Sequence, residues 1–249
     1  MNTTPRSSDS RALRRLPWRA VAAGMAALVF LCLEASAGAI TGVATRAGMG
    51  ANDMVEWGAA ADDGTFGVSP YARLSTGGVG VTATAADLAV FANNGNFYSG
   101  NFADGDIVLD TFFSEGPISI VFASAVRAVG FNLAHQTVGA FIGTLSFYGL
   151  GDVLFDSVTV NGNTTLDRDG TAAFIGGLSS LRDIMRVDVS TSLSGGSRAL
   201  TINQMSLLTT NPPTGGPVPE PTSLALVSLA LAGFALSRRS RRPGTFAAA

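Results

Sequence analysis

The sequence predicts an all-β body, an antiparallel and jelly-roll-like β-sandwich over residues 38–210, flanked by an N-terminal signal helix and a C-terminal transmembrane helix. Short segments in which apolar and polar residues alternate recur through the body. Turn signals separate these segments at short spacing. No amphipathic helical pattern of ten or more residues intervenes, although Ala85–Ala92 is expected to allow a short helix. Strands that follow one another without helices favour an antiparallel sandwich over a parallel α/β sheet.

Residues 1–37 have the three-part order of a secretory signal peptide. Five of the first twenty residues are arginines, the apolar run Ala20–Leu33 follows, and small residues with Ala35 and Ala37 complete the segment. Fourteen residues form a helix of roughly 21 Å, which is shorter than a hydrocarbon core of about 30 Å. We therefore expect signal peptidase to cleave after Ala37, with Ala39 as the second choice. A permanent N-terminal anchor is the alternative.

The body is expected to contain at least six strands, and dipeptides with glycine mark the turns between them. The strand segments are Ile118–Phe122, Val126–Leu133, Leu145–Phe147, Val153–Val160, Val187–Val189 and Ala199–Leu208. The turn signals are Asn94-Gly95, Asp104-Gly105, Asn161-Gly162, Asp169-Gly170 and Gly195-Gly196. The glycine-rich stretch from Gly42 to Gly80 predicts loops or irregular edge strands.

Charge and cysteine content narrow the function classes. The body carries 7 arginines against 15 acidic residues, a net charge of about −8, while the chain has no lysine. An acidic body argues against a nucleic-acid partner, which needs a basic surface, and is compatible with divalent cations or neutral glycans. Cys32 is the only cysteine and lies in the N-terminal apolar run, so a cleaved protein has no disulfide or cysteine-ligated zinc. Lipoprotein attachment at Cys32 is a further alternative.

The C-terminal segment combines three features in order. A Pro/Gly linker at 211–217 leads to Val218-Pro219-Glu220-Pro221, the apolar run Ser223–Leu236 follows, and arginines close the segment. The prolines hold the chain extended, which suits a protease groove. The arginine cluster is expected to stay cytoplasmic as a stop-transfer signal. Its members are Arg238, Arg239, Arg241 and Arg242.

This segment, residues 218–242, resembles the PEP-CTERM sorting tail that exosortases recognise. The resemblance implies export through the inner membrane, transient anchoring there, cleavage near the Pro-Glu-Pro segment and a final place at the cell surface or outside the cell. It also implies a role in a biofilm or exopolysaccharide matrix. The segment at 122–133, centred on Ala-Val-Arg-Ala-Val-Gly-Phe, and the segment at 170–177 resemble the β-sandwich bodies of such proteins. Residues 243–249 are expected to be a disordered end, and a plain C-terminal anchor is the alternative to a processed tail.

The body contains few residues that would support an enzymatic reaction. His135 is the only histidine, no Gly-x-Ser-x-Gly elbow accompanies it, and we expect it to be a loop or rim residue. Paired carboxylates hydrolyse glycosides, and the body has two glutamates, Glu56 and Glu115. Glu56 lies beside Trp57 and is the better candidate, but an exposed strand residue explains it more simply.

Calcium is the cofactor that the sequence leaves open, and no other cofactor is expected. Asp104, Asp106 and Asp110, with Asn101 near them, bring hard oxygen ligands to one turn, and Asp167 to Asp169 with Asn163 forms a second group. Neither group has EF-hand spacing, and ordinary Asp/Asn-Gly turn chemistry also explains both.

Aromatic residues are the candidates for sugar stacking. Trp57 and Tyr98 are the preferred pair, and Tyr71 and Tyr148 are the other aromatics of the body that are not phenylalanine. We expect a non-enzymatic, exported surface or matrix protein. The alternative is a secreted glycan-binding or glycan-active β-sandwich, with or without calcium.

Overall fold

A computed structural model describes residues 38–58, 64–95, 100–112, 114, 116–193 and 199–210. Among the residues described, no helix has the length and apolar character needed to cross a membrane. Two 3₁₀ turns, η1 (Ala47–Met49) and η2 (Leu150–Asp152), are the helical elements of this part of the chain. Every strand ladder in it is antiparallel.

The larger sheet contains nine strands in the order β1-β12-β9-β14-β7-β6-β3, and β15 joins β9 to β2 beside this path. Its strands are β1 (Ile40–Val43), β2 (Asp53–Val55), β3 (Thr65–Phe66), β6 (Ala89–Ala92), β7 (Ile107–Asp110), β9 (Ala128–His135), β12 (Ala173–Ser179), β14 (Leu200–Ile202) and β15 (Met205–Leu208). Strands near the start of the body, β1 and β2, thus pair with strands near its end.

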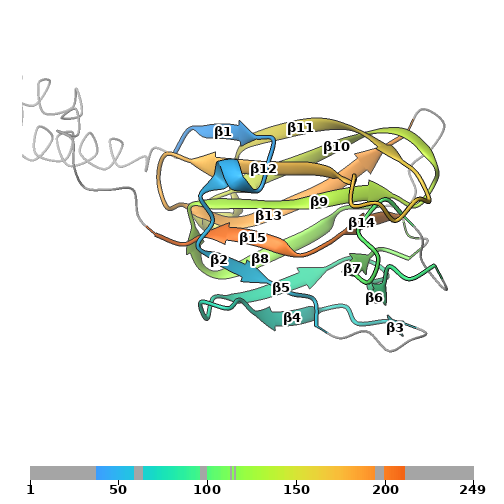
Figure 1. The fold of residues 1–249 in the computed structure, drawn as a ribbon. Coiled ribbons are helices and arrows are strands. Elements are labelled where there is room, and N and C mark those ends of the chain that lie inside the picture. The colour runs from blue at the N-terminus through green and yellow to red at the C-terminus, as the bar shows by residue number, and fades with distance from the viewer. Residues whose placement is uncertain are drawn as a thin grey trace, which may run out of the picture. The chain divides into compact units, whose positions relative to one another are not determined.

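The smaller sheet contains six strands in the order β11-β10-β13-β8-β5-β4. Its strands are β4 (Tyr71–Leu74), β5 (Gly80–Thr84), β8 (Ile118–Val126), β10 (Gly139–Tyr148), β11 (Leu154–Thr164) and β13 (Ile184–Ser192). Figure 1 shows the two sheets as layers, with β9 and β15 in one and β8 and β13 in the other.

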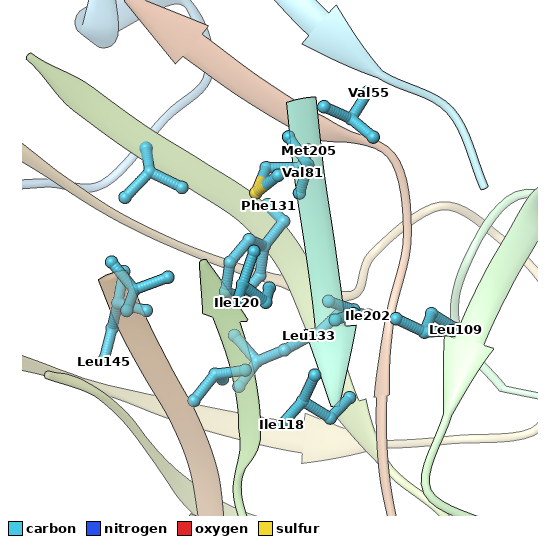
Figure 2. Packing of buried hydrophobic residues seen from close by; sticks show 14 of the residues in the cluster. Val55, Val81, Leu109, Ile118, Ile120, Phe131, Leu133, Leu145, Ile202 and Met205 are labelled. Carbon is cyan, nitrogen blue, oxygen red and sulfur yellow. The ribbon is translucent and has the colours of Figure 1, made fainter. Parts of the chain in front are cut away.

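One apolar core lies between the two sheets. Ile118, Ile120 and Leu145 from the smaller sheet belong to the same buried cluster as Phe131 and Leu133 from the larger one. Figure 2 shows these side chains meeting between the strands. Alternation explains the packing, because every second residue of a strand points to the same face. The prediction of an all-β body with antiparallel sheets is confirmed.

The number of strands differs from that of the predicted jelly roll. A jelly roll has eight strands in two sheets, whereas the described residues form sheets of nine and six strands. The helix expected at Ala85–Ala92 is wrong, because Ala89–Ala92 is strand β6. Ala89, Val90 and Phe91 are all buried, so packing on both sides of the strand outweighs the helix preference of alanine.

Two further predictions are corrected by the strand pairing. Asn161-Gly162 is not a turn but lies inside β11, where Gly162 pairs with Phe141 of β10. A Cβ atom on Gly162 would lie 2.2 Å from Cζ of Phe141, so the glycine makes room for that ring. The single strand expected at Ala199–Leu208 is divided into β14 and β15.

A β-bulge separates these two strands. Ile202 pairs with Leu133 of β9, whereas Ser206 pairs with Gly130, so residues 203–205 lie opposite only two residues of the partner. At this extra residue the side chain of Asn203 accepts from the backbone N–H of Asn132 in β9, and the side chain of Gln204 reaches Glu56. Bulges re-aim side chains in this way and are frequent beside functional sites.

Candidate functional site

A polar cleft of about 250 Å³ lies where β2 ends, β7 begins and the bulge turns outward. Glu56 comes from the end of β2, Asp106 immediately precedes β7, and Asn203 and Gln204 are the bulge residues. The fold therefore brings together two carboxylates that are 50 positions apart in the sequence and two consecutive amides.

Each side-chain amide of the bulge donates a hydrogen bond to one carboxylate of the cleft. Nε2 of Gln204 donates to Oε1 of Glu56 at 3.3 Å, and Nδ2 of Asn203 donates to Oδ2 of Asp106 at 3.3 Å. The amide oxygens are also engaged: Oδ1 of Asn203 accepts from the backbone N–H of Asn132 at 3.0 Å, and Oε1 of Gln204 accepts from Nη1 of Arg46 at 3.3 Å. These bonds fix the orientation of both amides, so the cleft presents ordered acceptors and donors.

The guanidinium of Arg46 forms hydrogen bonds with the residues that line the cleft and with their neighbours. Arg46 donates to the backbone carbonyl of Gln204 at 3.0 Å and to Oδ1 of Asn132 at 3.3 Å. Burial lowers the pKa of the Arg46 guanidinium, and the charge of Asp106 acts in the opposite sense. A cleft with carboxylates, amides and a nearby guanidinium can hydrogen-bond a polyhydroxylated ligand, because it offers both donors and acceptors.

An open groove of about 770 Å³ adjoins the cleft, and Glu56 and Gly58 line both. The groove extends over strands β4, β5 and β8 of the smaller sheet. Met54, Leu74 and Val121 line it with exposed fractions of 36%, 72% and 44%. Cleft and groove together offer a polar pocket beside a surface with aliphatic character.

The aromatic prediction is wrong for Trp57. Its side chain is 0% exposed and belongs to the main core, and Nε1 donates to the carbonyl of Asn203 at 2.8 Å. A buried indole cannot offer its face to a sugar, so Trp57 supports the bulge instead. Tyr71 is also engaged, because its hydroxyl donates to the carbonyl of Trp57 at 2.5 Å and the guanidinium of Arg73 lies 4.5 Å from its ring centre. Tyr98 lies outside the described residues.

The predicted calcium ligands do not converge. Asp104 is exposed and pairs with Arg168 at 2.7 Å, Asp106 lies in the cleft, and Asp110 is fully buried. Within the described ranges, no three His, Cys, Asp or Glu side chains gather into a metal-binding group. The three aspartates are thus not one ligand set, because β7 is extended and places its two ends apart.

Both carboxylate oxygens of Asp110 accept hydrogen bonds. Oδ1 accepts from the backbone N–H of Phe112 at 2.6 Å and from Nε2 of Gln136 at 2.8 Å, and Oδ2 accepts from the hydroxyl of Thr201. Burial raises the pKa of Asp110 to about 6, even though these hydrogen bonds act to lower it. A carboxyl group that is buried and fully bonded in this way has a structural role.

The remaining candidates are dispersed. Oδ1 of Asp169 accepts from both the backbone N–H and the hydroxyl of Thr171, and these bonds lower its pKa. His135 is not the rim residue expected, because it is 0% exposed at the end of β9. Its Nδ1 accepts from the N–H of Thr137 at 2.9 Å. Glu115 lies outside the described residues.

Sequence reasoning identified Glu56 and Asp106 separately but missed Asn203 and Gln204, which join them. The signal was present: two consecutive amides interrupt the apolar sequence Leu200 to Leu208, where regular alternation allows one polar residue at a time. Reading that interruption as a bulge would have predicted an outward-facing pair beside a strand end.

The comparisons with known proteins concern the body and the C-terminal segment separately. No curated protein matches the chain. A solved structure that resembles the body is a DUF4465 family protein from Bacteroides caccae, with 9% identity and a TM-score of 0.35, covering 68% of this chain and 100% of that one. At this similarity the comparison says nothing about function.

Residues 217–241 match the model of the PEP-CTERM protein-sorting motif. The match contains the Val218-Pro219-Glu220-Pro221 sequence, the apolar run and three of the four arginines, and it confirms the resemblance. These residues, and the signal residues Ala35 and Ala37, lie outside the described part of the structure. A PEP-CTERM motif implies export, processing by an exosortase and a final place at the cell surface or outside the cell. The chain is therefore a protein with a PEP-CTERM protein-sorting motif.

Proposed function

We propose that the protein is a non-enzymatic component of the cell surface or of an exopolysaccharide-containing matrix, to which the sorting tail delivers a single β-sandwich. The observation that carries the proposal is the PEP-CTERM match at 217–241, which begins nine residues after the last strand ends at Leu208. The short linker between them leaves the sandwich as the part that remains after cleavage. Its net negative charge favours a soluble module and disfavours nucleic acid.

The sorting step is tested by replacing Pro219, Glu220 and Pro221 with alanine. We expect the wild-type surface form to lack both terminal segments by intact mass, and the variant to remain in the inner membrane with its tail attached. The matched control replaces Pro212 and Pro213 of the linker with alanine, which leaves the motif intact. Normal processing of the triple-alanine variant would overturn the exosortase proposal.

A second candidate function, glycan binding or glycan hydrolysis, is favoured by the cleft. Glu56 and Asp106 line one cleft that shares Glu56 and Gly58 with an open groove, and this arrangement offers room for a chain-like carbohydrate. A glycan array with and without calcium tests this, using wild-type protein, Glu56→Gln, Asp106→Asn and, as control, the exposed Asp87→Asn.

The results of this experiment distinguish an enzyme, a binding module and a calcium-dependent module. Hydrolysis that is lost in Glu56→Gln supports an enzyme and contradicts the main proposal. Binding without turnover that weakens about tenfold in both cleft variants, but not in Asp87→Asn, supports a binding module. Binding that a chelator abolishes supports a calcium-dependent lectin-like module, and no binding to any glycan removes the second candidate.

A further inference from the structure

Both ends of the body lie at one end of the sandwich. The backbone N–H of Gly38 donates to Asp183 at 2.5 Å, in the turn between β12 and β13. The carbonyl of Leu208, the last residue of β15, accepts from the N–H of Arg127, whose own carbonyl accepts from the N–H of Ser179 at the end of β12. Figure 1 shows β1 beginning and β15 ending at the same, left-hand end of the sheets.

The same end exposes an unusual amount of aliphatic surface. The connection between β10 and β11 lies beside the β12–β13 turn, because Nε of Arg186 contacts Oδ1 of Asp152 at 2.5 Å and a Cβ on Gly149 would lie 3.7 Å from the carbonyl oxygen of Asp183. Four large aliphatic side chains are exposed on these two connections and at the first residue of β11, and we call them the apolar rim. They are Leu150 (87% exposed), Val153 (63%), Leu154 (55%) and Leu181 (45%).

Turn formation does not require these side chains. Connections of this kind are normally polar, with Gly, Asn, Asp or Ser, yet the rim holds four of the eleven large apolar side chains that are exposed among the described residues. Aliphatic groups that gather on two neighbouring connections cost solvation free energy unless a partner covers them. The rim is therefore an exposed apolar surface of the body that a partner would cover.

The covalent connections identify a bilayer as that occupant. Leu33, the last residue of the N-terminal apolar run, is five residues before Gly38, a distance of at most about 18 Å in an extended chain. Ser223, which opens the apolar run of the sorting motif, is thirteen residues after Thr210, at most about 45 Å. Both apolar runs thus join the body at the end that carries the rim, the N-terminal one until signal peptidase cleaves after Ala37 and the C-terminal one until the sorting motif is processed. A tether of this length keeps the rim at a high effective concentration near the membrane, so a weak contact is sufficient.

Charge at this end is also compatible with lipid headgroups. Nε of Arg127 donates to the carbonyl of Ser179 at 3.2 Å, and Nε of Arg182 donates to the carbonyl of Ala125 at 2.6 Å. Among the residues that the structure describes, neither guanidinium forms an ion pair with a carboxylate. Asp152 and Asp183 also lie at this end, where Asp152 pairs with Arg186 at 2.5 Å and Asp183 accepts from the backbone N–H of Gly38 and from the hydroxyl of Ser179. Two arginines without carboxylate partners beside exposed aliphatic side chains can contact an anionic bilayer surface.

We propose that the apolar rim is a membrane-contact surface, which rests on a phospholipid bilayer with anionic headgroups while the sorting segment anchors the chain. This inference rests on the proposed function, because it needs the tail to enter the membrane. The contact sets the body upright on the bilayer and holds the linker and the Pro219–Pro221 segment at the surface, where a membrane protease acts. Cleavage then releases the body, because the weak contact no longer benefits from a tether.

The test uses the full-length chain with Cys32→Ala, reconstituted in vesicles of phosphatidylcholine and phosphatidylglycerol. One variant carries Leu150→Cys and the matched control carries Val138→Cys, and each cysteine bears a fluorophore. Val138 is 55% exposed but lies before β10, at the opposite end of that ten-residue strand. Spin-labelled lipid is expected to quench the fluorophore at 150 at least about fivefold more strongly than the one at 138. Both positions are exposed connections, so the fold tolerates the labels.

Each outcome has a separate meaning. Equal quenching at the two positions, with the tail retained after carbonate extraction, overturns the rim proposal and leaves the proposed function intact. Loss of the chain from the vesicles on extraction contradicts the proposed function itself. Energy transfer between chains labelled at 150, with no lipid quenching, would identify a second copy as the occupant and also overturn the proposal. In cells, Leu150→Asp with Val153→Asp is expected to slow tail cleavage about tenfold, while Val138→Asp with Ile142→Asp leaves it unchanged.

Discussion

Asp110 shows how one residue can make the stability of this fold depend on pH. Burial raises the pKa of its carboxyl to about 6 in the folded protein, whereas an unfolded aspartate titrates near its ordinary value of 3.8. The folded state therefore binds the proton more tightly, and stability falls as the pH rises from about 4 to about 6. A difference of this size corresponds to about 3 kcal/mol between acidic and neutral pH.

Asp110→Asn should remove this pH dependence. An amide can still accept from the N–H of Phe112 and donate to the hydroxyl of Thr201, but it does not ionise. Urea unfolding measures the free energy of unfolding at several pH values. Between pH 4 and pH 7, the difference between variant and wild type is expected to shift by about 2–3 kcal/mol in favour of the variant. The exposed Asp87→Asn provides the control. A constant difference between variant and wild type across this range would contradict the prediction.

Asp53 acts in the opposite direction. Burial favours its neutral form, but donors from Ser75, Gly77, Thr76 and Met54 outweigh burial and lower the pKa of Asp53. Its stabilising contribution is therefore present above the unfolded pKa and is lost as the pH falls through the folded one. These bonds join β2 of the larger sheet to the turn between β4 and β5 of the smaller sheet. A single carboxylate thus links the two layers beside the groove.

At the scale of elements, the β10–β11 pair depends on the absence of a side chain at Gly162. The ring of Phe141 is buried and occupies the position where a Cβ on Gly162 would lie. Gly162→Val is expected to destabilise the protein by about 1–3 kcal/mol, because the ring must leave its place in the core. Urea denaturation measures the loss. Asn161→Val, on the exposed face of the same strand, should change stability by less than about 0.5 kcal/mol, and equal losses in both variants would refute this explanation.

The strands of the core could be predicted from alternation, because burial on one face leaves a period of two in the sequence. Ile118 and Ile120, or Leu145 and Phe147, lie as that pattern indicates. Gly162 could not be predicted, because the ring that requires a glycine belongs to another strand. Asn-Gly therefore looked like a turn. Trp57 was misjudged for a related reason: nothing local shows that the bulge carbonyl of Asn203 accepts a hydrogen bond from its indole.

The cleft was predictable only in part. Glu56 and Asp106 could be selected as acidic residues in favourable contexts, but their shared location depends on β2 and β7 both approaching the bulge after β14. Sequence patterns give the type and length of neighbouring elements, whereas sites assembled from three distant segments depend on strand order. The same limitation explains why Asp104, Asp106 and Asp110 seemed to form one calcium site, although an extended strand separates them.

At the scale of the whole molecule, the ends of the body hold the larger sheet together. Ile40 pairs with Ser179 and Val55 pairs with Met205, so β1 and β2 find their partners more than 130 residues later in the chain. Contacts between such distant residues make folding slow, because a long loop must close first. The body is therefore expected to complete its fold only after β15 has been exported, while the sorting segment still holds the chain in the membrane.

Two truncations test whether β15 completes the fold. A chain that ends after Thr210 retains every described strand and is expected to unfold cooperatively, with the same midpoint as the tail-bearing chain in the same detergent. A chain that ends after Gln204 lacks β15, which leaves β2 and the Ala128–Gly130 part of β9 without a partner on that side and exposes the partners of Met205 and Leu207 in the core. Losing the burial of those two side chains alone costs about 3–6 kcal/mol, which is comparable with the total stability of a small domain. The shorter chain should therefore show no cooperative transition by circular dichroism, and a sharp transition at the wild-type temperature would show that β15 is dispensable.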